Sequence, residues 1–329
     1  MKKETKIKIG VGVAVGVTAA IAATKAVMDV MSDVTVAKDM PPAATKVKKV
    51  LTDKLIDDEA WTAATALSKE LEKRPHEEVT IDNRDGLKLV GHWFERQNAK
   101  RVVICFHGWR SGWSTDFAPA VPFFENEDCS LLLVEQRSHG KSEGEYIGFG
   151  VYERFDCLDW IEYAHAREPQ LPIYLCGISM GASTVLMASG LGIPSCVHGI
   201  IADCGFTSPR AIWAHVMKKN AKIGEKLSYP LANYFISKKA GYRGEDASTI
   251  DAMKVCRVPI LFVHGDVDGF VPLSMTEQNY EACASDKTLL VVKGADHGTS
   301  YIVDPESYEN HVRELFARYD GKVSNKALQ

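Results

Sequence analysis

The stretch YLCGISMGAST, residues 174–184, joins an apolar run to a run of small residues. Between the two runs, Gly177 and Gly181 lie two residues on either side of Ser179. The apolar run predicts a buried strand, and the small residues that follow favour a helix. A serine at a sharp strand-to-helix turn is one way in which proteins present a nucleophile. Three fixed positions are weak support alone, so the neighbouring segments have to decide.

Short apolar runs recur along the chain on both sides of this stretch. They are RVVICFHG (101–108), SLLLVEQR (130–137), PIYLCGIS (172–179), VHGIIADC (197–204), PILFVHG (259–265) and TLLVVKG (288–294). Continuous runs of this length are typical of strands buried on both faces. Helical stretches such as 152–167 separate most of them, and 78–96 predicts a hairpin around Asp85-Gly86. We therefore expect an α/β fold with a mostly parallel sheet of about eight strands and helices on both faces.

Three polar residues follow three of these runs, where the strands are expected to end. Ser179, Asp268 and His297 come in that order along the chain. In such sheets the chemistry gathers at the carboxyl ends of the strands. The order serine, acid, histidine is the one that an α/β-hydrolase requires. Asp266 and Asp203 remain alternatives for the acid.

These residue types suit nucleophilic catalysis. A serine hydroxyl needs a base to take its proton, and His297 can act so if the carboxylate of Asp268 orients its ring. The negative oxygen of a tetrahedral intermediate then needs fixed donors. We expect these to be the backbone N–H groups of Met180 and Trp109, with His107 and Gly108 letting the loop turn tightly beside the nucleophile.

Five motifs taken together resemble a known family. HGWRSG (107–112), QRSHGKSEG (136–144), GISMGAS (177–183), HGDVDGFVP (264–272) and GADHG (294–298) look like the matching motifs of bacterial α/β-hydrolase serine hydrolases, described as esterase-like or serine-aminopeptidase-like. The resemblance covers roughly Val79 to Tyr319. In the family pattern His-Gly-x-x-Asp-x-x-Val-Pro the fifth position carries the acid, which favours Asp268 over Asp266.

The resemblance implies an enzyme that needs no metal or organic cofactor. The favoured substrate is a small-molecule ester or short acyl compound, cleaved through an acyl-enzyme as in a carboxylesterase. A peptidase of the serine-aminopeptidase type is the alternative within enzymes. A membrane-tethered, non-catalytic binding protein on the same fold is the alternative of another class.

The segment 206–252 is longer than a simple crossover, and in this family that position commonly carries a small helical cap. Its aromatic and sulfur side chains, together with one residue after Asp268, are candidates for an apolar acyl pocket. They are Trp213, Met217, Tyr229, Tyr234, Phe235 and Phe270. The alternative for each is that it simply holds the cap on the body.

The N-terminus has four lysines before an uncharged stretch from Ile9 to Thr24. Sixteen residues is short of the about 20 that a bilayer needs, but flanking lysines can extend the span to Ile7–Met28. We therefore expect residues 1–30 to form a membrane anchor with the catalytic domain outside the cytoplasm. A cleaved signal peptide, giving a secreted protein, and a helix of a cytoplasmic protein are the alternatives. Residues 31–78 are expected to form a linker and lead-in helices, 79–320 the hydrolase domain and 321–329 a tail.

Composition excludes some classes of protein. The net charge of −4 gives no basic surface for nucleic acid. HGKS (139–142) has Glu135 where a phosphate-binding loop needs glycine, so Arg137 and His139 are expected to brace the loop beside the site. The eight cysteines contain no Cys-x-x-Cys pair, which favours free, packed thiols and disfavours a zinc site.

Overall fold

The computed structural model of the chain describes residues 22–46, 58–221 and 225–321. Its centre is an eight-stranded sheet in the order β1-β2-β4-β3-β5-β6-β7-β8. The strands are β1 (Glu77–Asp82), β2 (Lys88–Phe94), β3 (Arg101–Phe106), β4 (Cys129–Glu135), β5 (Ile173–Ile178), β6 (Val197–Asp203), β7 (Ile260–Gly265) and β8 (Lys287–Val292). β2 runs antiparallel to β1 and β4, and the other neighbours are parallel. The predicted fold class, including the hairpin at the edge of the sheet, is confirmed.

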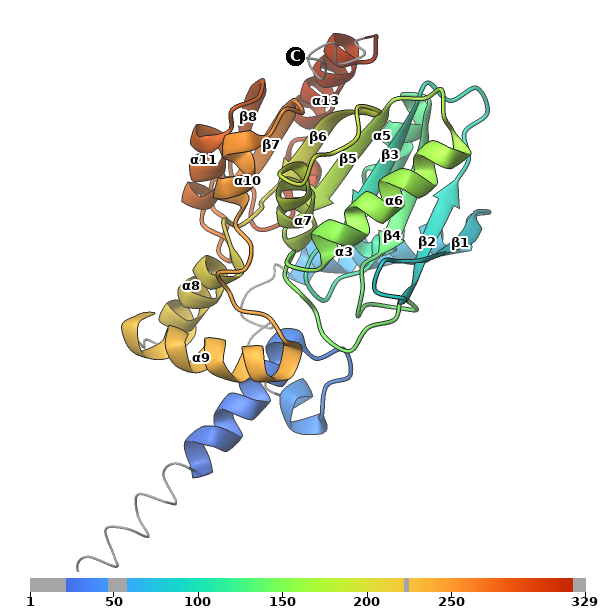
Figure 1. The fold of residues 1–329 in the computed structure, drawn as a ribbon. Helices are drawn as coiled ribbons and strands as arrows, with labels where there is room; N and C mark the ends of the chain where they lie inside the picture. Colours follow the sequence, from blue (N-terminus) through green and yellow to red (C-terminus); the bar gives the residue numbers. More distant parts are fainter. Residues whose placement is uncertain (1–21, 47–57, 222–224, 322–329) are drawn as a thin grey trace, which may run out of the picture.

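Helices cover both faces of the sheet (Figure 1). One face carries α6 (Glu153–Arg167), α7 (Met180–Ser189), α10 (Thr249–Val255) and α11 (Leu273–Ala282). The other carries α3 (Asp58–Lys73), α4 (Trp113–Phe117), α5 (Val121–Asn126), α12 (Ser300–Val303) and α13 (Pro305–Tyr319). Two further helices, α8 (Pro209–Ala221) and α9 (Glu225–Ala240), lie within the predicted cap segment.

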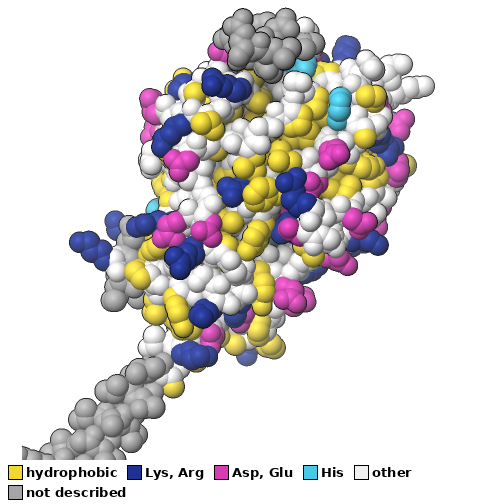
Figure 2. Space-filling model, in the orientation of Figure 1, with side chains coloured by type: hydrophobic (Ala, Val, Ile, Leu, Met, Phe, Trp, Pro, Cys, Tyr) yellow, Lys and Arg dark blue, Asp and Glu magenta, His cyan; other side chains and the backbone are white. Residues whose placement is uncertain are grey.

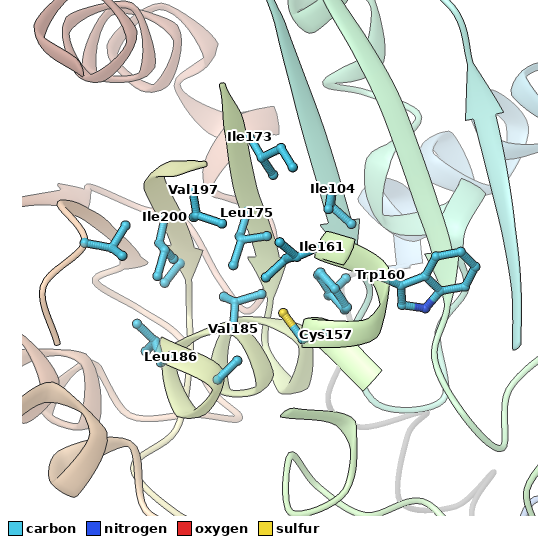
Figure 3. Packing of buried hydrophobic residues seen from close by; sticks show 14 of the residues in the cluster. Ile104, Cys157, Trp160, Ile161, Ile173, Leu175, Val185, Leu186, Val197 and Ile200 are labelled. Carbon is cyan, nitrogen blue, oxygen red and sulfur yellow. The ribbon is translucent and has the colours of Figure 1, made fainter. Parts of the chain in front are cut away.

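The strands alternate their side chains between two apolar cores. Ile104 of β3 packs in the core under α6 and α7, whereas its neighbour Cys105 packs in the core under α13. This is the period of two that a pleated strand imposes. Figure 3 shows the first core, where strand residues such as Leu175 face Val185 of α7 and Ile161 of α6. Because both faces are covered, the strands read as continuous apolar runs in the sequence.

The cap and the start of the described chain lie at one end of the molecule. Figure 1 shows α8, α9 and the helix formed by residues 22–36 together beyond one end of the sheet. Residues 31–46, expected to belong to a linker, include side chains that are almost fully buried. These are Ser32, Val34, Val36, Ala37 and Ala44. This segment is therefore packed against the domain.

The predicted membrane span, Ile7–Met28, lies for the most part outside the described residues. Among the residues that the structure does describe, no helix is both long and apolar enough to cross a bilayer. The anchor is thus not supported by the structure and stays a prediction.

All eight cysteines are free thiols, as predicted, and seven of them are buried. On the face shown in Figure 2, basic and acidic side chains are interspersed, with hydrophobic side chains between them. This mixture agrees with the small net charge of the sequence.

Candidate active site

Ser179 lies at the turn between β5 and α7, in a backbone conformation that residues other than glycine seldom adopt. Its φ is 55° and its ψ −112°, a strain that costs roughly 1–3 kcal/mol. Glycine is required on both sides. A Cβ on Gly181 would lie 1.8 Å from the carbonyl oxygen of Phe106, and one on Gly177 would lie 2.4 Å from the backbone of Gly181. The glycines let α7 pack against β3 and β5, and the turn holds Ser179 at the strand end.

A hydrogen-bonded chain joins the three residues singled out in the sequence. The Oγ of Ser179 is 2.9 Å from Nε2 of His297, and Nδ1 of His297 is 2.7 Å from Oδ2 of Asp268. A carboxylate can only accept, so Nδ1 carries the proton and Nε2 is left to accept from the serine hydroxyl. The structure thus brings together side chains from the ends of β5, β7 and β8.

The carboxylate of Asp268 is fixed by its own loop. Oδ1 accepts the backbone N–H groups of Phe270 and Val271, at 2.7 and 2.8 Å. Oδ2 also lies 3.2 Å from Nε2 of His264, and both side chains are fully buried. Burial by itself raises the pKa of Asp268, but the charge of His297 and the hydrogen bonds from His264 and His297 hold it well below its usual value. Asp268 is therefore ionised at neutral pH.

The pKa of His297 is shifted in the opposite direction to that of Asp268. Burial lowers its pKa, yet the neighbouring Asp268 more than offsets this, and the pKa is raised above its usual value of 6.5. The imidazolium formed when His297 takes a proton is thus stabilised where it stands. The ring of Phe270 lies 5.0 Å from that of His297 and shields it on one side.

The two alternative acids lie elsewhere. Asp266 is exposed, and its Oδ1 accepts the N–H of Gly294 at 2.6 Å. Asp203 is buried and accepts the hydroxyl of Ser300 at 3.0 Å, and burial raises its pKa to about 6. Neither carboxylate contacts a nitrogen of His297, so the geometry singles out Asp268.

Two backbone N–H groups beside Ser179 have no acceptor in the part of the chain that the structure describes. They belong to Trp109 and Met180, the two donors predicted for the negative oxygen. Met180 is the first residue of α7, where the N–H groups of a helix are unpaired and the helix dipole favours negative charge. Gly108 brings the other loop close: a Cβ there would lie 3.4 Å from that of Ser179.

The loop 107–112 is held by side chains from elsewhere in the chain. The N–H of Gly108 donates to Oδ2 of Asp116 at 2.6 Å, and that of Arg110 to Nε2 of His139 at 3.1 Å. The buried ring of His107 accepts the N–H of Gln136 at 3.1 Å. Because Nε2 accepts in both histidines, both are neutral, in keeping with pKa values that burial lowers. His139 braces the loop as predicted, while Asp116 was missed because nothing in its sequence surroundings marks it.

The predicted pocket residues separate into an inner and an outer set. Trp213 is buried against Phe149 and Tyr242, in the same apolar core as Met180, and Phe270 packs at its edge. The indole N–H of Trp213 has no partner among the described residues. Tyr234, by contrast, lies on the second cap helix, α9, and is 57 % exposed. Met217 is half-buried on α8, and Tyr229 is buried in the same core as Trp213. Of these residues, Phe270 is the one whose ring contacts that of His297.

A family model described as "Serine aminopeptidase, S33" matches residues 97–246, just under half of the chain. This range contains Ser179 and the loop 107–112 but ends before Asp268 and His297. An esterase from Pyrococcus furiosus, Pf2001, superposes with a TM-score of 0.63 at 26 % identity, over 77 % of this chain and 94 % of that one. The chain has the α/β-hydrolase fold. The comparisons support a hydrolase of this fold.

Other relatives agree on the fold and leave the substrate open. Est1E of Butyrivibrio proteoclasticus, solved with ferulic acid, also has the α/β-hydrolase fold, with a TM-score of 0.58 at 18 % identity over 74 % of this chain and all of that one. The uncharacterized protein YqkD of Bacillus subtilis is 27 % identical over 71 % of this chain and 77 % of its own length. YfhR of Escherichia coli K12, also uncharacterized, is 23 % identical over 74 % and 77 %.

One group at the site has the residue types of a metal centre. Ligand atoms of Cys204, Asp268 and His297 lie within 4.8 Å of one another. Asp268 and His297 already bond to each other, and a metal would need the thiolate of Cys204. Burial raises the pKa of Cys204 well above its usual value, so the thiol holds its proton. The set fits a hydrogen-bonded acid–base pair better than a metal.

A cavity of about 300 Å³ runs along α8. It is lined by Arg210, Ala211, Ala214, His215 and Lys218. On the same helix, Lys219 donates to the carbonyl of Gly269 in the loop after Asp268, so α8 borders the acid loop. The side chains that line the cavity are basic or small. No pattern in the sequence predicted this cavity.

Proposed function

We propose that the protein is a serine hydrolase that cleaves carboxylic esters through an acyl-enzyme intermediate. The observation that carries the proposal is the chain from Ser179 through His297 to Asp268, next to two unpaired backbone N–H groups. This is the arrangement that acyl transfer needs: a nucleophile, a base, a group that orients the base, and donors for the oxyanion.

Each residue has a role in the proposed reaction. His297 Nε2 takes the proton of Ser179 as the oxygen attacks the ester carbonyl, and the oxyanion formed is held by the N–H groups of Trp109 and Met180. His297 then returns the proton to the leaving alcohol, and the acyl-enzyme forms. Water, activated by the same imidazole, attacks the acyl-enzyme, and the acid product leaves with Ser179 restored. Asp268 stays ionised and stabilises the imidazolium in both halves.

The inner pocket residues support an acyl substrate of modest size. Trp213 and Phe270 offer apolar surface close to His297 and Met180. The unpaired indole N–H of Trp213 offers one donor to a substrate oxygen. A buried donor without a partner costs free energy, and a bound carbonyl or ether oxygen would relieve that cost.

The peptidase alternative rests on the name of the family model. An aminopeptidase has to hold the ammonium group of its substrate, for which a carboxylate is suited. The cavity along α8 is lined by the cations Arg210 and Lys218, whose charges repel an ammonium group, and by His215, whose pKa is lowered by burial. Because Lys219 of α8 contacts the loop after Asp268, we propose that a substrate extending toward the cap meets these cations, and on that ground we favour the esterase.

Labelling with a fluorophosphonate probe tests the catalytic proposal. We expect wild-type protein to label and Ser179→Ala to fail, because the probe reacts with an activated serine. Ser274→Ala, which removes an exposed serine hydroxyl on α11, is the matched control and should label like wild type. Equal labelling of all three proteins, or none in wild type, contradicts the proposal and favours the non-catalytic binding protein.

The substrate class needs a second measurement, on enzyme that has not been treated with the probe. Turnover of p-nitrophenyl esters with short and long acyl chains is compared with that of aminoacyl p-nitroanilides. We expect the esters to be the better substrates, by kcat/KM. A larger kcat/KM for the anilides would assign the peptidase instead.

The location of the protein is a separate proposal that rests on sequence alone. The lysines before Ile9 and the uncharged stretch that follows support an N-terminal anchor with the catalytic domain outside the cytoplasm. Carbonate extraction of cell membranes, followed by protease treatment of intact cells, tests both halves. Full-length protein found entirely in the soluble fraction contradicts the anchor.

A further inference from the structure

Residues 33–38, called the strap below, end the first described helix and lie against the loop that carries Trp109. Helices leave their last carbonyl groups without partners of their own. Here those carbonyls are taken up by side chains from the loop 107–112 and by one backbone group. The indole N–H of Trp109 donates to Thr35 at 2.8 Å, and the N–H of Ile147 donates to Val36 at 2.7 Å.

Arg110 makes the larger share of this contact. Its Nε donates to the carbonyl of Val34 at 2.8 Å, and its Nη2 to the carbonyls of Asp33 at 3.0 Å and Ala37 at 2.7 Å. Arg110 forms no ion pair within the described part of the chain, and burial lowers its pKa to about 10. The carbonyls at the negative end of the helix therefore compensate its partly buried charge. Hydrogen bonds from a charged donor of this kind are stronger than those between neutral groups.

The strap is itself fixed to two other parts of the domain. The side chain of Asp33 pairs with Lys239 of the cap helix α9. Ala37 forms an antiparallel bridge with Tyr146, and the N–H of Lys38 donates to the carbonyl of Glu145 at 2.8 Å. Val36 is fully buried in the apolar core that also contains Met180. The strap therefore cannot shift without moving the cap or the segment after β4.

Of the two residues held by the strap, Trp109 carries the N–H that the proposed reaction uses, and Arg110 follows it in the chain. Arg110 has a φ of 53°, a conformation uncommon for a residue other than glycine, so its backbone needs support from outside. His139 holds its N–H and the strap holds its side chain. Trp109, whose own N–H is unpaired, is thus fixed by its ring on one side and by Arg110 on the other.

We propose that the strap is a positioning element for the oxyanion hole: through Arg110 and the indole of Trp109 it sets where the Trp109 N–H points. The inference rests on the proposed function. The proposed reaction then depends on residues that precede the loop 107–112 by about 70 positions in the sequence.

Steady-state kinetics on full-length variants test the inference. Arg110→Met removes three hydrogen bonds to the strap and keeps most of the side-chain volume. Trp109→Phe removes the bond to Thr35 and keeps an aromatic ring beside Phe270 and Arg110. Arg110→Lys keeps the charge and part of the bonding, and Arg96→Met, at an exposed arginine paired with Asp128, is the matched control. Each rate is divided by the number of active sites, titrated with a fluorophosphonate, so that a loss of folded protein does not count as a loss of rate.

We expect Arg110→Met to lower kcat per active site by roughly tenfold to a hundredfold, since complete loss of an oxyanion donor costs about 10²–10³. Trp109→Phe and Arg110→Lys should lose less, and the KM of all variants should stay within about twofold. The Ki of a trifluoromethyl ketone, which forms an oxyanion on the serine, should rise by the factor by which kcat/KM falls.

Wild-type kcat per active site in Arg110→Met and Trp109→Phe overturns the inference, as does a fall in kcat with an unchanged ketone Ki. If Arg110→Met does not fold, Trp109→Phe and Arg110→Lys decide by the same two measurements. Failure of the proposed function is recognised separately, because wild-type protein would then neither label nor turn over esters.

Discussion

The two loops that flank Ser179 are held in different ways. The loop with Asp268 is held mainly from within: the carboxylate accepts N–H groups two and three residues further on, and His264 contacts it from four residues before. Lys219 and Asp296 add contacts from outside, both to the backbone of Gly269. The loop with Trp109 is held from outside, by Asp116, His139 and the strap. A change in the first loop therefore acts on the base directly, whereas a change around the second acts through the position of one N–H group.

The largest effect is expected from the loop with Asp268. Asp268→Asn leaves the shape of the side chain but removes the charge that stabilises the His297 imidazolium, and its amide favours the wrong tautomer. We expect kcat to fall by about 10³–10⁴-fold with the fold intact. Ester turnover by titrated enzyme measures the rate, and circular dichroism the fold.

Asp266→Asn is the matched control, two residues away in the same loop. Its exposed carboxyl only accepts the N–H of Gly294, which an amide oxygen can do as well. We expect wild-type kcat from it. A large loss in Asp266→Asn with little in Asp268→Asn would assign the acid to Asp266.

A smaller effect is expected where the second loop is braced. In Asp116→Asn, one oxygen that accepts from Gly108 or Ser111 becomes an amide N–H₂, which repels the donor it faces. We expect kcat to fall about tenfold at constant KM, because the Trp109 N–H is displaced but not lost. Rates are measured at pH 8, since Asp116 also helps to raise the pKa of His297.

Asp128→Asn is the control for this change. Asp128 is a surface carboxylate paired with Lys100 and Arg96, and such pairs contribute little. The variant should match wild type in kcat. An Asp116→Asn enzyme that also matches wild type would show that the loop keeps its shape without this brace.

The same contrast explains what the sequence could predict. The acid loop, the turn at Ser179 and the buried strands are encoded in short segments, in which glycine spacing and apolar runs carry the geometry. The strap could not be predicted, because its contacts are made by backbone carbonyls, which no side-chain pattern marks. Tyr234 looked like Trp213 in sequence, but an apolar residue on a cap helix can face either way. The catalytic roles themselves stay predictions until activity is measured.

The smallest expected effect is on the pH dependence of kcat/KM, which distinguishes the roles of the two loops. Because the pKa of His297 is raised above 6.5, kcat/KM should fall as the pH drops through that raised value. The stability of the fold depends on pH in the opposite direction. The protonated His297–Asp268 pair stabilises the fold below the unfolded pKa of His297, and this contribution is lost as the pH rises through the folded pKa.

In Asp268→Asn the main cause of the raised pKa is gone, so the acid limb of kcat/KM should move to lower pH. In Arg110→Met the limb should stay in place while kcat falls, because the strap acts on the oxyanion donor and not on the base. If the acid limb of kcat/KM moves in Arg110→Met, or stays in place in Asp268→Asn, then the two loops do not act separately on the oxyanion donor and on the base.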